Sequence, residues 1–140
     1  MTLRIDWGDL EFALTWRTDE GRYFLDRETG EVIAWTGVDD PEHSEDELDA
    51  GLAEGRLLPI DPLPSPVEYD WMEEFAATVG KPELRRQLEA ALRASRPFRR
   101  LKDVLADYPA ERQRWFAFHS ERLREAAKEW LEENGIASAT

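Results

Sequence analysis

The chain has 140 residues, with 31 acidic and 18 basic side chains that give a net charge of -13. Six tryptophans and six phenylalanines are more apolar bulk than a disordered chain carries, so the composition excludes a mostly unfolded protein. The absence of cysteine excludes disulfides, thiolate metal sites and a cysteine nucleophile. No apolar run approaches the ~20 residues of a membrane span. The first residues also lack the apolar core of a signal peptide, so we expect a cytoplasmic protein.

Charge is distributed unevenly along the chain. Residues 1–80 hold 5 basic and 21 acidic side chains, whereas residues 81–128 hold 13 basic and 7 acidic ones. The overall acidity opposes non-specific binding to nucleic acid or anionic lipid, but a local basic surface remains available for an anionic partner.

The N-terminal part predicts a short helix, a β-hairpin and a second helix. Trp7, Leu10 and Leu14 recur at helical spacing, with Asp6 placed to cap. Residues 22–26 and 31–35 are rich in aromatic and β-branched side chains, and residues 27–30 form a hairpin loop with Gly30 in a left-handed position. The segment 17–21 breaks the first helix. A capping box predicts the second helix at 45–53, and Pro59 marks residues 56–60 as an edge-like third strand.

The remainder predicts helices punctuated by prolines. Ser65 is the expected N-cap of the first of these, with Pro66 at its first helical position and Glu68 completing a capping box. Further helices are expected from Pro82, from Pro97 up to Pro109, and from about 110 to 134. Gly135 and Ile136 predict a Schellman end to the last helix. Four helices joined by short turns are expected to form a bundle.

These elements together predict an α+β fold. An N-terminal helix and an antiparallel β-hairpin or three-stranded sheet precede a mainly helical C-terminal bundle. We expect an acidic α/β part at residues 1–60, a Pro-rich connector at 61–66 and a helical part at 67–140, all within one compact domain.

Three segments resemble one known family in the same order along the chain. They are the hairpin at 23–32, the turn and helix at 96–105, and the C-terminal segment at 129–136. In these segments the chain resembles the uncharacterised protein family UPF0158. The resemblance implies a small bacterial-type protein with no assigned activity and no established catalytic residues, so it carries no functional residue over.

The usual signatures of catalysis and of metal or cofactor binding are missing from the sequence. His43 and His119 are the two histidines, and neither lies near a serine in a nucleophile elbow. The acidic run at 39–49 lacks the alternating pattern and central glycine of a calcium loop, and no glycine-rich loop precedes a helix. We therefore predict no catalytic residue, no metal ligand and no cofactor, and we interpret His119 as a packing residue.

A basic stretch is the best candidate for a binding site. Arg96, Arg99, Arg100 and Lys102 surround the start of one predicted helix, where free amide donors also point out of the first turn. Arg96, Arg99 and Arg100 share a face if that helix begins early. An acidic protein segment or a nucleic acid would fit this basic face. The alternative is that these cations are solvated or paired within the chain, where the acidic half is available to cover them.

The sequence leaves the function open between two classes. The preferred interpretation is a non-catalytic binding or regulatory module that uses this basic face. The rival is a small-molecule enzyme with a site between the acidic sheet and the basic helices, in which Asp103, Asp107 and His119 are the first suspects. A weaker third interpretation, an acidic mimic of nucleic acid, rests on net charge alone.

Tryptophans near the hairpin suggest a further interface. If Trp16 and Trp35 are exposed, they mark a contact surface, and we expect a homodimer through the sheet edge.

Overall fold

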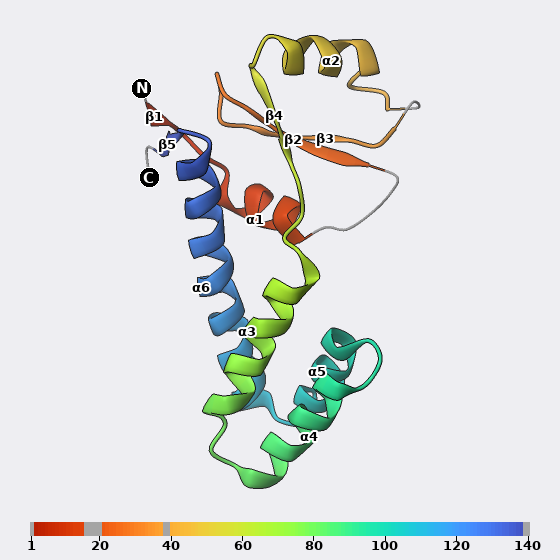
Figure 1. Cartoon of the computed structure of the whole chain (residues 1–140), viewed down its shortest axis with the longest axis vertical. Coiled ribbons are helices and arrows are strands. Elements are labelled where there is room, and N and C mark those ends of the chain that lie inside the picture. The colour runs from red at the N-terminus through yellow and green to blue at the C-terminus, as the bar shows by residue number, and fades with distance from the viewer. Residues whose placement is uncertain (1, 16–20, 38–39, 139–140) are drawn as a thin grey trace. The chain divides into compact units, whose positions relative to one another are not determined.

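The computed structural model describes residues 2–15, 21–37 and 40–138 of the chain. The chain divides into two compact units: unit 1 comprises residues 1–62 and 124–140, and unit 2 comprises residues 63–123. The predictions for Trp16, for Arg17–Glu20 and for Asp39 fall outside the described residues. In chain order the elements are β1 (Thr2–Leu3), α1 (Trp7–Thr15), β2 (Arg22–Asp26), β3 (Val32–Trp35), α2 (Glu45–Ala53), β4 (Leu57–Ile60), α3 (Ser65–Thr78), α4 (Pro82–Arg93), α5 (Pro97–Leu105), α6 (Pro109–Glu133) and β5 (Ala137–Ser138) (Figure 1).

The predicted α+β class is confirmed, with a three-stranded antiparallel sheet in the order β3-β2-β4. The hairpin turn lies at residues 27–30, and Gly30 adopts a left-handed φ of 81°. The Gly30 N–H donates to the Asp26 carbonyl at 2.8 Å, and the Asp26 N–H donates to the Glu31 carbonyl at 2.9 Å. The third strand pairs with β2 from the other side, with Pro59 opposite Phe24. A proline fits there because β4 is an edge strand with one side free of ladder bonds.

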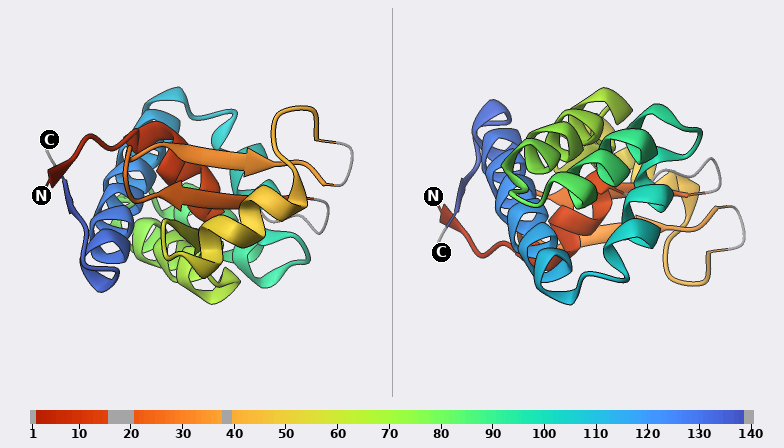
Figure 2. Two further views of the ribbon diagram at one scale, coloured as in Figure 1. Left: turned by 90° about the horizontal axis from the view of Figure 1, so that it is seen from above. Right: turned by 90° about the horizontal axis from the view of Figure 1, so that it is seen from below.

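Alternation along β2 sends neighbouring side chains to opposite faces of the sheet. Phe24 packs with Leu48 of α2 and Leu57 of β4 in one buried cluster. Tyr23 points the other way and meets the ring of Phe12 of α1 edge to face, with ring centroids 6.1 Å apart. The sheet of unit 1 is therefore covered by α2 on one face and α1 on the other (Figure 2). Burial, followed by the charge of Asp9, raises the pKa of the Tyr23 phenol.

Two very short strands join the ends of unit 1. β1 and β5 pair in parallel, with Thr2 opposite Ala137 and Leu3 opposite Ser138. The chain reaches β5 through the predicted Schellman end: the Ile136 N–H donates to the Leu131 carbonyl at 2.9 Å, and Gly135 adopts a φ of 70°. Nothing in the sequence pattern predicted this pairing, because two-residue strands carry no periodicity.

Unit 2 has a core built from four helices. α3 contributes Met72 and Phe75, α4 contributes Leu88, α5 contributes Leu101, and α6 contributes Trp115. Leu88 and Leu101 are completely buried. Core residues recur three or four positions apart along α3, α4 and α5, as Leu84, Leu88 and Leu92 do in α4, and this gives each of these helices the apolar stripe that a helical bundle needs. Within the described residues, no helix is both long and apolar enough to cross a bilayer.

The structure corrects two helix boundaries. α3 begins at Ser65 itself, its N-cap is Pro64, and no side chain caps it, so the predicted capping by Ser65 is wrong. The extended backbone of Pro64, with φ -59° and ψ 141°, already leads the chain into the helix one residue early. α5 ends at Leu105, three residues before the predicted end at Tyr108. Ala106 and Asp107 form a turn, and Pro109 begins α6 rather than merely ending α5.

Candidate anion-binding face

The helix α5 begins at a sharp turn made by Ser95 and Arg96. Arg96 is the N-cap and adopts a left-handed backbone with φ 52°, which no other non-glycine residue does in the described part of the chain. Such a backbone costs an L-residue about 1–2 kcal/mol, and it is unusual directly before a proline. Arg100 holds the turn twice: its backbone N–H donates to the Arg96 carbonyl at 3.1 Å, and its side-chain Nε donates to the Ser95 carbonyl at 3.0 Å.

We call four exposed cations of this turn and of α5, Arg96, Arg99, Arg100 and Lys102, the basic face; Lys102 lies in the last turn of the helix. The structure places Arg96 outside the helix, so it joins Arg99 and Arg100 through the turn and not as part of a helical stripe. The Lys102 ammonium lies 4.5 Å from the centroid of the Phe98 ring. Phe98 itself is half-buried and packs on the core of unit 2.

None of these four cations forms an ion pair within residues 2–15, 21–37 and 40–138, in contrast to several cations elsewhere. In unit 2, Arg85 pairs with Glu89 at 3.2 Å, and Arg122 pairs with Glu74 at 2.9 Å. Arg114 pairs with Glu111, one turn away on α6. In unit 1, Arg124 pairs with Glu11 at 3.0 Å. These acidic side chains therefore pair with cations of other helices and not with the basic face.

Helix α5 also departs from the usual distribution of charge at a helix start. It has no acidic residue in its first turn, whereas α1, α2, α3, α4 and α6 each have at least one. Acidic side chains stabilise the positive end of the helix dipole by about 0.3–1 kcal/mol each, and cations there do the opposite. Arg96, Arg99 and Arg100 therefore add to an end that is already electropositive, and an anion at this place would relieve both effects.

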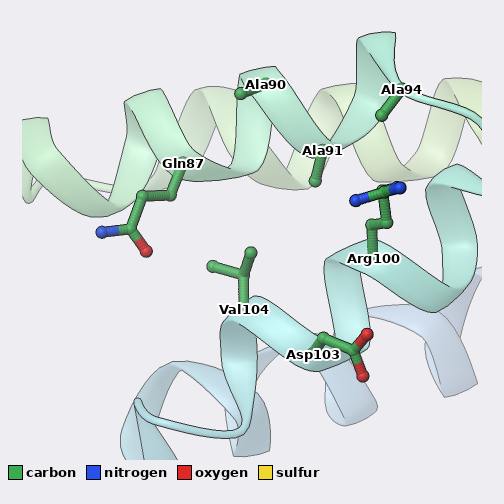
Figure 3. Close-up of a pocket in the computed structure, with 7 residues that line it drawn as sticks. All are labelled: Gln87, Ala90, Ala91, Ala94, Arg100, Asp103 and Val104. Carbon is green, nitrogen blue, oxygen red and sulfur yellow. The ribbon is translucent and has the colours of Figure 1, made fainter.

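A groove lies beside the basic face, between α4 and α5 (Figure 3). It has a volume of about 350 Å³ and is lined by Gln87, Ala90, Ala91, Ala94, Arg100, Asp103 and Val104. The Arg100 guanidinium extends from α5 towards Ala91 of α4 and Ala94, the C-cap of α4 (Figure 3). Sequence reasoning found Arg100 but missed the groove. The small side chains at 90, 91 and 94 are its only trace in the sequence.

The three residues of the rival enzyme interpretation lie in different surroundings. Asp103 is exposed at the rim of the groove, and Asp107 is exposed just beyond the end of α5. His119 is half-buried in unit 2, and its ring lies against Trp71, Phe98 and Trp115. Among the described residues, neither aspartate forms a hydrogen bond or ion pair with His119.

Instead, the structure pairs His119 with Glu68, a residue that the sequence assigned to capping. The Nε2 of His119 lies 3.6 Å from Oε1 of Glu68 and makes no hydrogen bond, and Glu68 as a whole is 8% exposed. The sequence does carry a signal that Glu68 lies on the buried face of α3, because it precedes Trp71, Met72 and Phe75 by three, four and seven residues.

Comparisons with known proteins agree with one another. The family model described as "Uncharacterised protein family (UPF0158)" matches residues 1–140. A curated relative from Pseudomonas aeruginosa, named UPF0158 protein PA5073, is 38% identical over 141 residues, which cover 99% of this chain and 87% of the relative. No solved structure matches the chain.

Proposed function

We propose that this chain, which belongs to the uncharacterised protein family UPF0158, is a non-catalytic binding module that holds an anionic partner on the basic face of α5. The observation that carries the proposal is the set of four exposed cations without an ion pair in the described chain, whereas Arg85, Arg93, Arg114 and Arg122 on the neighbouring helices are paired. Solvation alone explains a single unpaired arginine, but it gives no reason for four unpaired cations within residues 96–102.

The local charges at α5 favour binding of an anion more strongly than the net charge of the whole chain disfavours it. At an ionic strength of 0.15 M, exposed charges more than about 8 Å apart are largely screened from one another. An anion in contact with α5 therefore responds first to the four cations and to the helix start, not to the net charge of -13. The same screening makes binding at this face sensitive to salt.

Other unpaired cations in unit 2 provide a matched control. Arg86 and Arg112 are exposed and form no ion pair among the described residues. Arg86 donates to the Pro82 carbonyl, and Arg112 lies over the ring of Phe116. Reversing their charges changes the net charge of the chain as much as reversing two charges on the basic face, but the substitutions lie on α4 and α6 instead of α5.

The test is affinity capture at low salt from native lysate, with and without nuclease, using the full-length chain. We expect the double variant Arg99→Glu/Arg100→Glu to lose the partner by about tenfold or more, which corresponds to ~1.4 kcal/mol. Arg99→Glu/Lys102→Glu is expected to do the same while leaving the contact of Arg100 with Ser95 intact. Arg86→Glu/Arg112→Glu is expected to retain the partner.

Capture that is unchanged in both basic-face variants would overturn the proposal. Equal losses in all three double variants would also overturn it, because net charge and not the basic face would then determine binding. Circular dichroism of each variant checks that the helical content of the chain is retained.

One observation favours the enzyme alternative, namely the proximity of His119 to Glu68. A histidine beside a carboxylate is a common arrangement for moving a proton. Their side chains are only 21% and 11% exposed, respectively, and three aromatic rings surround the histidine, so a substrate would have to displace the packing of unit 2 to reach it. A small molecule that raises the melting temperature of the wild type but not of His119→Gln would favour this alternative.

A further inference from the structure

The groove between α4 and α5 combines three kinds of chemistry within a small space. Alanines 90, 91 and 94 and Val104 line it with apolar surface, while Gln87, Arg100 and Asp103 supply a neutral amide, a cation and an anion (Figure 3). A ligand that fits all three must itself carry an apolar group, an acidic group and hydrogen-bonding groups.

Arg100 connects this groove with the basic face. Its Nε is already bonded to the Ser95 carbonyl at 3.0 Å, which fixes the guanidinium and leaves its two terminal nitrogens for a ligand. A carboxylate can accept two parallel bonds from such a planar fork. Because the side chain is held before binding, less conformational freedom is lost when the ligand arrives.

The same features argue against nucleic acid. A strand of nucleic acid carries one negative charge about every 3.4 Å, so part of its backbone would approach the Asp103 carboxylate wherever another part meets Arg100. The residues that line the groove also include no aromatic ring on which a base could stack, and stacking is a main source of affinity for single strands. A protein segment avoids both problems, since its carboxylates are separated by neutral side chains and its N–H groups can donate to Asp103.

We infer that the anionic partner is an acidic amphipathic segment of another protein, which places an apolar side chain in the groove and a carboxylate on Arg100. This inference rests on the function proposed above and specifies its partner. Arg96 lies at the turn before α5, where its carbonyl accepts the Arg100 N–H, so it can meet a further acidic residue of the same segment.

The test uses three fluorescent probes and the full-length chain at low salt. The first probe is a short amphipathic helical peptide with leucine on one face and glutamate on the other. The second is the same peptide with every leucine replaced by serine, and the third is a single-stranded DNA oligonucleotide of the same charge. We expect the leucine peptide to bind at least about tenfold more tightly than the serine peptide, because only the former buries apolar side chains.

Two substitutions separate the groove from the charge. Ala90→Trp fills the groove without changing any charge, and the alanine is exposed, so the helix can accept the larger side chain. Ala117→Trp, at an exposed position of α6 outside the groove, is the matched control. We expect Ala90→Trp to weaken binding of the leucine peptide by about tenfold and Ala117→Trp to leave its affinity unchanged.

The outcomes distinguish this inference from the proposed function. If Arg99→Glu/Arg100→Glu abolishes binding but Ala90→Trp does not weaken it, the inference is overturned and the anion-binding face stands. If the oligonucleotide binds more tightly than both peptides, the inference is also overturned, while the proposed function stands. If no probe binds and lysate capture is empty as well, both fail.

Discussion

The hairpin turn of unit 1 allows one stability prediction to be worked out in detail. Gly30 adopts a φ of 81°, and a Cβ built on it would lie 3.1 Å from the Arg4 carbonyl carbon, with the carbonyl oxygen closer still. Gly55 provides an internal control, because it adopts a similar φ of 76° but a Cβ there would have nothing within 4 Å. Alanine at position 55 therefore meets backbone strain alone, whereas alanine at position 30 meets the same strain and a backbone clash.

The expected losses differ by the cost of that clash. Left-handed backbone costs alanine about 1–2 kcal/mol, partly offset by the lower entropy of its unfolded chain, so Gly55→Ala is expected to lose about 1 kcal/mol. Moving a packed backbone aside adds about 1–3 kcal/mol, as overpacking does elsewhere. Gly30→Ala is therefore expected to lose about 2–4 kcal/mol in total.

Urea unfolding followed by tryptophan fluorescence measures both variants against the wild type. The quantity to compare is the free energy of unfolding, and the slope against urea must stay constant for the comparison to hold. Equal losses at the two glycines would refute the reasoning, because they would mean that the approach of Arg4 to the turn contributes nothing.

Three further predictions concern other parts of the chain. The backbone N–H of Thr36, with those of Glu42 and His43, lowers the pKa of Asp40 to about 2. Its stabilising effect is thus present above about pH 4 and lost as the pH falls towards 2, so the unfolding free energies of wild type and Asp40→Asn are expected to converge over that range. A gap that persists at the lowest pH would contradict this. Asp26→Ala leaves the Glu28 N–H and Arg56 unpaired and is expected to cost about 2 kcal/mol, measured by urea unfolding, while Asp26→Asn costs less because its amide oxygen still accepts from Glu28. Leu88→Ala is expected to lose about 2–5 kcal/mol of unfolding free energy, and the exposed Gln113→Ala almost none; similar values for both would show that position 88 is not in the core.

Local signals in the sequence predicted the elements well because each has a cause within a few residues. Gly30 requires a left-handed turn, Ser44 caps α2, and Pro82 and Pro97 each begin a helix. The Ser44 hydroxyl does accept the Glu47 N–H at 3.2 Å, as the capping box predicts. The prediction failed at Ser65, where the same pattern is present but the preceding proline starts the helix first.

The surroundings of the candidate site were less predictable because they depend on residues far apart in the sequence. Arg100 was visible as a cation, but the groove beside it also needs Ala91 of α4 and Ala94 at the end of that helix. Glu68 matched a capping pattern and a buried helical stripe at once, and its proximity to His119, 51 residues later, decided between them. Whether a cation is paired, as Arg122 is with Glu74, also becomes visible only when the helices are placed together.

The parallel pairing of β1 with β5 has a consequence for the order in which the two units fold. Unit 2 consists of one continuous stretch, so its core forms from contacts between segments that are close in the sequence. Unit 1 combines residues 1–62 with residues 124–140, and the pairing of Thr2 and Leu3 with Ala137 and Ser138 closes a loop that contains all of unit 2 in the sequence. We therefore expect the helical unit to fold first, although it lies later in the sequence than the sheet, because closing a long loop costs more entropy and slows folding.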